Sequence, residues 1–325
     1  MIAAVMQEVS TRLSVRQVPD PVPIRKSEVI VRLRAAALNH RDLWIQQGLY
    51  AGIKTPVILG SDGAGRLGRR DVLINPSINW SSGAKHPPHP KKYKILGLPD
   101  DGTLAEYVRV PRQNVYPIPR HLSMEEAAAL PLAGLTAYRV LFSRCKLTAR
   151  DRVLINGIGG GVALMAFQYA VATGAETWVT SSSPAKIKKA IQLGAAGGIR
   201  YTEAEWDKKL TTRAGLFDVI IDSAAGKGFG RLVKIANYGA RIGIYGGTTG
   251  PIEGLIPQIV FWKQLNILGS TMGNAREFAR MLDFVSRHKI KPVIDKVYPL
   301  KQVNRALKRM QSGKQFGKIV IRIED

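Results

Sequence analysis

From Arg152 onward, short apolar segments with strand character alternate with segments of helical pattern. Strand segments are expected at residues 153–155, 177–180, 198–201, 217–222, 240–245 and 266–270. Helix signals fall between them, for example the pair Ser183-Pro184, which is typical of a helix start. Strands joined through helices pair in parallel, so the alternation predicts a doubly wound parallel sheet with helices on both faces.

The residues before this region follow a different pattern. Segments 28–34, 71–74 and 105–110 are short, rich in β-branched residues and bounded by Pro, Gly or Asp, which is typical of strands. Twelve prolines between positions 19 and 119 break the region into short strands and loops. This composition predicts a compact β-barrel.

A capping box, Ser123 to Glu126, opens an alanine-rich helix and marks the start of the second domain. The segment 318–323 alternates with period two, which predicts a strand with one solvent-exposed face. A parallel sheet seldom ends in such a strand, so we assign it to the barrel. The expected domains are therefore residues 1–120 completed by 291–325, and residues 121–290.

Length and cysteine content limit the possible classes of protein. A chain of 325 residues with 45% hydrophobic residues exceeds the usual size of a single core, which again favours two domains. The single cysteine, Cys145, excludes an intrachain disulfide and a structural zinc site built from several thiolates. We expect a cytoplasmic protein without a secretion signal.

One stretch, residues 153–175, lacks charged residues over a length that could span a bilayer. Its glycines, Asn156 and Gln168 are better explained by a strand, a tight turn and a helix. We therefore expect no membrane segment.

The net charge of +24, from 48 Lys and Arg against 24 acids, predicts attraction to polyanions. The basic residues are scattered and form no aromatic-interleaved motif, so the pattern does not favour specific nucleic-acid binding.

The first strand of the second domain leads into a glycine-rich turn and then a helix. Such a turn lets a pyrophosphate approach bare backbone at a helix N-terminus. The pattern predicts a dinucleotide site, although a valine stands where the third glycine of the usual motif would be and a merely tight turn is the alternative. The residues expected to bind are Gly157, Gly159, Gly160, Gly161 and Val162.

The end of the second strand indicates which dinucleotide binds. An NAD site carries an acid there, whereas this chain has Ser181, Ser182 and Ser183, followed by Lys186. Hydroxyls and an ammonium favour a 2′-phosphate, which predicts NADP(H). The alternative is that Ser183 only starts a helix and Lys186 is a solvated helix residue.

Several blocks of sequence together resemble the medium-chain dehydrogenase/reductase superfamily. The nearest branch is that of the zinc-type alcohol dehydrogenase-like proteins and quinone oxidoreductases. The resemblance implies a GroES-like β-barrel catalytic domain and a Rossmann cofactor domain. The matching blocks are 37–44, 59–65, 101–108, 133–138, 267–273 and 316–320.

Zinc-dependent members of that superfamily carry a Cys at the position of Asn39, a His at Ser61 and a third ligand near Leu132. These residues cannot replace thiolate or imidazole ligands. The four-cysteine lobe is also missing, and His86 and His89 lie in a proline-rich basic loop of the kind that is usually solvent-exposed. We expect no metal.

The resemblance also implies roles for individual residues. Asn39, Tyr50 and Thr136 would line the nicotinamide pocket, with Asn39 and Tyr50 as catalytic hydrogen-bond donors and Asp42 holding their loop. The alternatives are that Asn39 caps a turn and that Tyr50 is a rim aromatic. We expect Cys145 to be a packed residue and not a nucleophile, because no His lies near it in sequence and it falls outside the matching blocks. Further contacts to the cofactor would come from Ser181, Lys186, Tyr201, Tyr245, Gly246, Gly317 and Lys318.

These observations predict an NADPH-dependent oxidoreductase that transfers hydride to a quinone, an enone or enal, or a related activated alkene without metal. The alternative is an NADPH- and RNA-binding protein with weak or vestigial turnover. We expect a small-molecule acceptor and a homodimer formed through residues 266–270. The physiological acceptor and the proton donor do not follow from the sequence.

Overall fold

The computed structural model describes residues 1–80 and 92–323. The chain divides into two compact units, one formed by Met1–Leu135 with Gly273–Asp325, the other by Thr136–Met272. The first unit is discontinuous and includes residues 121–135 and 273–290, which we had placed in the second domain. Helix α2 (Met124–Ala129) packs on barrel strands, which explains why it groups with the first unit.

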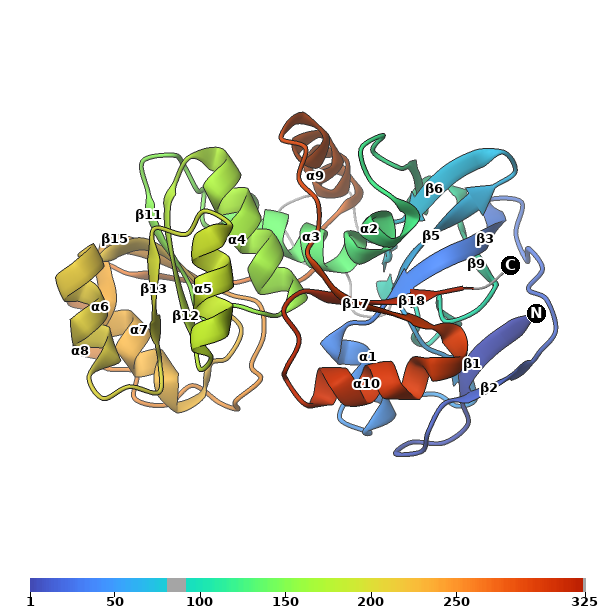
Figure 1. The fold of residues 1–325 in the computed structure, drawn as a ribbon, viewed down its shortest axis with the longest axis horizontal. Coiled ribbons are helices and arrows are strands. Elements are labelled where there is room, and N and C mark those ends of the chain that lie inside the picture. The colour runs from blue at the N-terminus through green and yellow to red at the C-terminus, as the bar shows by residue number, and fades with distance from the viewer. Residues whose placement is uncertain (81–91, 324–325) are drawn as a thin grey trace. The chain divides into compact units, whose positions relative to one another are not determined.

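The first unit is built mainly from short strands, in agreement with the expected barrel (Figure 1). Its largest sheet has the order β10 (Val115–Pro117), β6 (Arg70–Ile74), β5 (Asp62–Leu67), β3 (Glu28–Ala37), β18 (Lys318–Arg322) and β17 (Ile294–Pro299), and β9 (Tyr107–Pro111) also pairs with β3. Smaller sheets join β2 (Ser14–Gln17), β1 (Ile2–Met6) and β4 (Val57–Ile58), and β7 (Ser77–Ile78) with β8 (Lys94–Ile95).

Two helices of this unit begin at capping boxes. Ser123 Oγ accepts from the Glu126 N–H at 3.2 Å, which confirms the expected N-cap, and Asn274 Oδ1 accepts from the Glu277 N–H at 2.8 Å. The helices are α1 (His40–Gln46), α2, α9 (Ala275–Arg287) and α10 (Val303–Gln311). Strands and helices enclose one apolar core.

Strand β18 departs from expectation. Residues 318–321 are all buried and only Arg322 is exposed, so the prediction of one solvent-exposed face was wrong. The strand pairs with β3 on one side and β17 on the other, and α2 and α10 both pack against it. Lys318 is consequently a buried lysine, not a solvated one.

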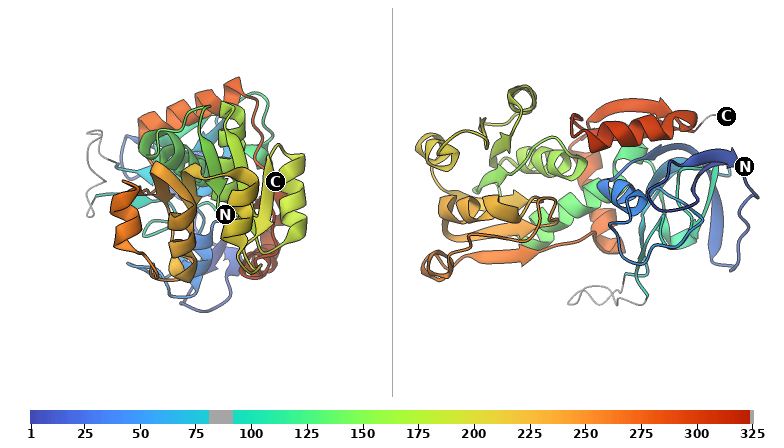
Figure 2. Two further views of the ribbon diagram at one scale, coloured as in Figure 1. Left: turned by 90° about the vertical axis from the view of Figure 1, so that its left-hand side faces the viewer. Right: turned by 90° about the horizontal axis from the view of Figure 1, so that it is seen from below.

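The second unit contains the predicted sheet. Its strands are all parallel, in the order β13 (Gly197–Arg200), β12 (Glu176–Ser181), β11 (Arg152–Ile155), β14 (Phe217–Asp222), β15 (Ala236–Ile244) and β16 (Asn266–Gly269). Figure 2 shows helices on either face of this sheet. They are α4 (Gly161–Thr173), α5 (Pro184–Gln192), α6 (Trp206–Ala214), α7 (Phe229–Ile235) and α8 (Pro257–Trp262), and the unit boundary falls within α3 (Pro131–Tyr138).

The charge-free stretch 153–175 forms β11, the glycine-rich turn and α4. In the described part of the chain no helix has both the length and the apolarity needed to cross a bilayer.

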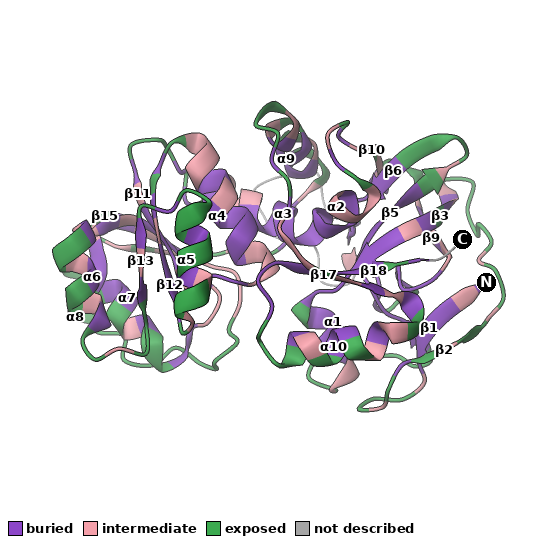
Figure 3. Cartoon of the chain, viewed as in Figure 1, coloured by how far each residue is buried: buried purple, intermediate pink, exposed green. Residues whose placement is uncertain are grey.

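Residue burial in the second unit follows its layered arrangement. The central strands of the sheet are buried, whereas helices α5 and α8 on its surface carry exposed residues (Figure 3).

Candidate active site

The glycine-rich turn lies between β11 and α4 in the second unit. Gly157 has φ +77° and Gly159 φ +138°, both in the region that favours glycine. A Cβ added at Gly157 or Gly160 would meet no atom within 4 Å, so space remains open above this backbone. Since Gly160 is the N-cap of a 13-residue helix, the turn fits an anionic group such as a pyrophosphate.

Polar side chains from the neighbouring strands hold the turn in place. Thr180 Oγ accepts from the Gly157 N–H at 2.9 Å and donates to Asn156 Oδ1 at 2.6 Å. Asn156 Nδ2 donates to Asp222 Oδ1 at 2.7 Å, and Asp222 is fully buried. Sequence reasoning missed this network, although its members stand at the carboxyl ends of three adjacent strands, where ligands bind in such sheets.

Lys186 lies beside the turn. A Cβ on Gly159 would come within 2.9 Å of Lys186 Cδ and 3.0 Å of its Nζ, so the ammonium is placed against the glycine backbone. Ser183 caps α5 by accepting from the Lys186 N–H at 3.4 Å, and this cap fixes where the lysine leaves the helix.

The other residues at this strand end have local partners. Ser181 is buried and its Oγ accepts from the Ser183 N–H at 3.2 Å, while Ser182 is exposed. Tyr201 is 43% exposed, and its backbone N–H donates to Ser181 O at 3.1 Å. The structure thus gathers Ser181, Lys186 and Tyr201 around the end of β12, and their contacts with a cofactor stay predictions.

The remaining predicted residues of this unit are spread over other elements. Thr136 is buried in α3 and its hydroxyl donates to Met272 Sδ at 3.7 Å. Tyr245 follows β15, and burial raises the pKa of its phenol above the usual value. At Gly246 a Cβ would approach Ser223 O to 3.1 Å. Gly161 and Val162 form the first turn of α4 and are partly exposed.

In the first unit, a buried polar cluster joins α1, β5 and β18. Lys318 Nζ donates to Asn39 Oδ1 at 2.7 Å and to Asp62 Oδ2 at 2.8 Å, and Asn39 Nδ2 donates to Asp62 Oδ2 at 2.9 Å. Asp62 Oδ1 accepts from the Leu132 N–H at 2.7 Å. Asp62 is fully buried, and Asn39 and Lys318 are less than a tenth exposed.

A second buried cation, Arg41, lies on α1. Arg41 donates to Ser61 Oγ at 2.6 Å and to Leu96 O at 2.9 Å, and its guanidinium carbon lies 5.2 Å from the centroid of the Tyr50 ring. This stacking is a cation–π contact, so Tyr50 is held by a charge and its ring is half-buried.

Asp42 fixes the start of α1. Its Oδ2 accepts from the Asn39 N–H at 2.7 Å, as expected for a residue that holds this loop. Its Oδ1 is buried without a partner among the described residues, and burial raises the pKa of the carboxyl although Arg41 lowers it. Asn39 is the N-cap of α1, so it has a structural role in addition to any catalytic one.

The residues at the zinc-ligand positions do not fit a metal. Asn39 Oδ1 already accepts from the Lys318 ammonium, which would repel a divalent cation. Ser61 Oγ accepts from Arg41 and donates to Leu96 O at 2.8 Å, and Leu132 has no ligand atom. The described residues contain no cluster of three His, Cys, Asp or Glu able to hold a metal, whereas His86 and His89 lie outside the described residues.

Gly317 is needed for packing. Its φ is +122°, and an added Cβ would lie 2.3 Å from Val293 O. Close approach between two backbone segments therefore explains this glycine independently of any cofactor contact. The same approach helps to position the next residue, Lys318.

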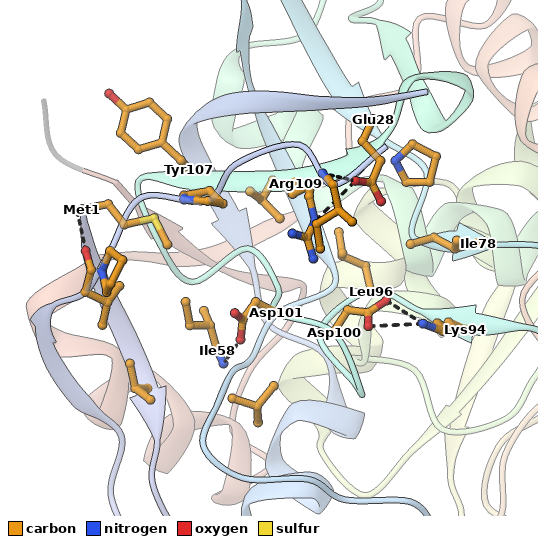
Figure 4. A pocket seen from close by; sticks show the side chains of 18 of the residues that line it. Met1, Glu28, Ile58, Ile78, Lys94, Leu96, Asp100, Asp101, Tyr107 and Arg109 are labelled. Carbon is orange, nitrogen blue, oxygen red and sulfur yellow. Dashed lines mark hydrogen bonds and ion pairs between the residues drawn. The ribbon is translucent and has the colours of Figure 1, made fainter. Parts of the chain in front are cut away.

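A separate cavity of about 530 Å³ lies in the first unit. Its walls carry paired charges, with Lys94 bonded to Asp100 at 3.0 Å, Arg109 beside Glu28 at 3.7 Å and Asp101 accepting from the Ile58 N–H at 2.9 Å (Figure 4). The Lys94–Asp100 and Arg109–Glu28 pairs are each satisfied within the wall, and Asp101 is bonded to backbone. The cavity therefore offers less for polar recognition than the Asn39 cluster.

Cys145 is fully buried. Burial raises the pKa of its thiol to about 12, so the reactive thiolate is almost absent at neutral pH. This agrees with the interpretation of Cys145 as a packed residue.

Comparison with known proteins agrees with the geometry of both units. Residues 25–120 match the family model described as alcohol dehydrogenase GroES-like domain, and residues 161–287 match that described as zinc-binding dehydrogenase. A zinc-type alcohol dehydrogenase-like protein of Leptosphaeria maculans is 34% identical, over 96% of this chain and 94% of its own.

Two solved structures are similar over the whole chain. An NAD-dependent alcohol dehydrogenase has a TM-score of 0.91 and 34% identity, with 100% of both chains covered. The quinone oxidoreductase of Thermus thermophilus, whose structure was solved alone and with NADPH, has a TM-score of 0.83 and 25% identity, over 99% of this chain and 100% of its own.

Three observations agree in one assignment. They are the parallel sheet with its open glycine turn, the match to a GroES-like domain, and the relative of 34% identity along nearly the whole chain. This chain belongs to the medium-chain dehydrogenase/reductase superfamily, as an oxidoreductase of that type.

Proposed function

We propose that the protein is an NADPH-dependent reductase of quinones, enones, enals and related activated alkenes that works without a metal. The observation that carries the cofactor choice is the position of the Lys186 ammonium against Gly159. It lies beside a strand that ends at Ser181 and is followed by Ser182, without an acid. An ammonium favours a 2′-phosphate, whereas the carboxylate of an NAD site is missing there.

When bound, NADPH supplies the hydride that reduces the acceptor, and solvent can supply the accompanying proton. The chain must bind the cofactor and the acceptor, orient them toward one another and polarise the acceptor oxygen. Asn39 is the candidate donor to the acceptor oxygen, with Tyr50 as a second, each contributing on the order of a few kcal/mol in the transition state. Quinones and enones suit such a site because their reduced anions are delocalised and need less electrophilic help than simple ketones.

The test is single-turnover oxidation of NADPH and of NADH with a panel of acceptors. The panel contains 1,4-benzoquinone, 2-cyclohexen-1-one, an enal and cyclohexanone, with ethanol and NADP⁺ for the reverse direction. We expect oxidation of NADPH by the first three and little reaction with cyclohexanone or ethanol. Preferred turnover of ethanol, or faster reaction with NADH, would contradict the proposal, and NADPH binding without turnover would favour the RNA-binding alternative.

We also propose a homodimer formed through β16. This strand is the edge of the sheet, and the preceding helix α8 contains no buried residue. Phe261 and Trp262 are 65% and 73% exposed. Large exposed apolar side chains beside an open strand edge are typical of an interface, and pairing with a second copy would cover both.

A further inference from the structure

The buried cluster in the first unit fixes which side of the Asn39 amide can face a ligand. Its Oδ1 lies 2.7 Å from the Lys318 ammonium and its Nδ2 lies 2.9 Å from the Asp62 carboxylate. Rotating the amide by half a turn would set an oxygen against a carboxylate and N–H groups against an ammonium. Both contacts would then be repulsive, so the orientation follows from the charges.

One donor of the amide is left over. The Nδ2 group has two N–H bonds, and one of them is used by Asp62. The other has no partner among the described residues, while Oδ1 is occupied by Lys318. A ligand that reaches Asn39 therefore meets a hydrogen-bond donor and not an acceptor.

The pair that sets this orientation is itself rigidly held. Asp62 also accepts from the Leu132 N–H at 2.7 Å, and its backbone O accepts from Thr103 Oγ at 2.8 Å. Lys318 stands in a strand that is hydrogen-bonded on both sides. With Asp62 fully buried and Lys318 at 4% exposure, water competes little for either charge, which strengthens both contacts to the amide.

We propose that Lys318 and Asp62 are positioning residues that lock Asn39 as a hydrogen-bond donor, and that this lock makes the site select acceptors that bind through a carbonyl or quinone oxygen. An alcohol, which must donate its own proton, finds no acceptor at Asn39. The inference rests on the proposed function, because it assumes that the acceptor contacts Asn39. In this proposal the Lys318–Asp62 pair determines that the site interacts with the acceptor oxygen, which a metal would otherwise do.

Three variants test the lock. Lys318→Arg keeps a cationic donor to Asn39, whereas Lys318→Met removes it and leaves Asp62 unpaired. Because an unpaired buried charge destabilises a fold, the double variant Lys318→Met/Asp62→Leu removes both charges together. Lys296→Met is the matched control, since Lys296 is an exposed lysine on the neighbouring strand β17.

The expected kinetic result is a loss in the hydride-transfer rate at saturating 2-cyclohexen-1-one. The double variant should be slower by roughly 10- to 100-fold, below the loss of roughly 100- to 1,000-fold that follows removal of a direct oxyanion donor. Lys318→Arg should recover part of the rate, and the Lys296→Met control should match the unchanged protein. NADPH affinity, measured by fluorescence in the same variants, separates a loss in hydride transfer from a loss of the predicted contact between Lys318 and the cofactor, and the Lys296→Met control should bind NADPH as the unchanged protein does.

A spectroscopic readout separates positioning from folding and from the proposed function. In protein labelled with ¹⁵N-asparagine, addition of cyclohexanone, an unreactive oxygen ligand, should shift one Asn39 side-chain N–H resonance and leave its geminal partner nearly unchanged. In the double variant this shift should shrink, because the amide is then free to rotate about its Cβ–Cγ bond and no longer holds the N–H group toward the ligand.

The possible outcomes are distinct. Full enone activity and unchanged Asn39 signals in the double variant would overturn the lock while leaving the proposed function intact. Absence of NADPH oxidation with every acceptor, together with a single shifted N–H, would refute the proposed function and support the lock as a ligand-binding device. No Asn39 shift with any oxygen ligand in an active enzyme would refute the contact itself.

Discussion

The cofactor choice can be tested at a single side chain, Lys186. Replacing Lys186 with Ala removes the ammonium that lies against Gly159 and leaves the turn and its Thr180 anchor in place. A hydrogen bond to a charged group contributes about 1.5–3 kcal/mol. Lys186 is half-buried, so we expect about 2 kcal/mol for NADPH at low salt, which is roughly a thirtyfold loss in affinity.

NADH lacks the 2′-phosphate, so its affinity should change by less than about twofold in Lys186→Ala. The assay is titration of the cofactor fluorescence at two ionic strengths, and the NADPH loss should shrink as salt screens the contact. Lys188→Ala is the control, because this exposed lysine lies on the same helix two residues later. Ser181→Asp should act in the opposite sense, weakening NADPH and giving NADH a partner for its ribose hydroxyl.

Equal losses for NADPH and NADH in Lys186→Ala would refute this reasoning. They would mean that Lys186 stabilises the turn itself, and the preference for NADP(H) would lose its main support. A change in thermal stability alongside equal losses would identify the structural role directly.

Further predictions concern metal, assembly and the thiol. Purified protein should hold far less than one zinc per chain, and treatment with a chelator should leave its activity intact; elemental analysis giving stoichiometric zinc would contradict this. Trp262→Glu should convert a dimer to a monomer in sedimentation at micromolar concentration, whereas the exposed Tyr238, changed to Glu as a control, should not; a native monomer would remove the dimer proposal. Cys145, with its pKa raised to about 12, should react with a disulfide reagent at pH 8 only after unfolding, and rapid labelling of the folded protein would show an opening that this burial does not allow.

Much of the fold could be predicted because local patterns and tertiary environment agree. The glycine turn between 153–155 and the following helix, the Ser123 and Asn274 caps, and the six parallel strands all follow from period, turn chemistry and capping. Strand β18 could not be predicted as accurately. Its alternation of polar and apolar residues is typical of a strand with one exposed face. The strand is nevertheless buried, because it pairs on both sides and two helices pack against it.

The sequence points to individual residues of the candidate site but not to the networks that hold them. Asn39 and Lys186 are indicated by their motifs, and their roles toward acceptor and cofactor stay predictions. The contact of Lys318 with Asn39 joins residues 279 positions apart, and no periodicity encodes such a distance. The Asn156, Thr180 and Asp222 network likewise depends on which strands become neighbours, which is a property of the assembled sheet.

The ion pair between Asp62 and Lys318 also sets an order of events during synthesis. The two residues are 256 positions apart, which at about 5–20 residues per second corresponds to roughly 13–50 s of translation. During that interval the nascent barrel contains Asp62 without its cation, so it cannot bury the carboxylate at low cost. The segment Thr136–Met272 leaves the ribosome within the same interval, and the sheet of the second unit can therefore fold before the last strands of the first unit are synthesised.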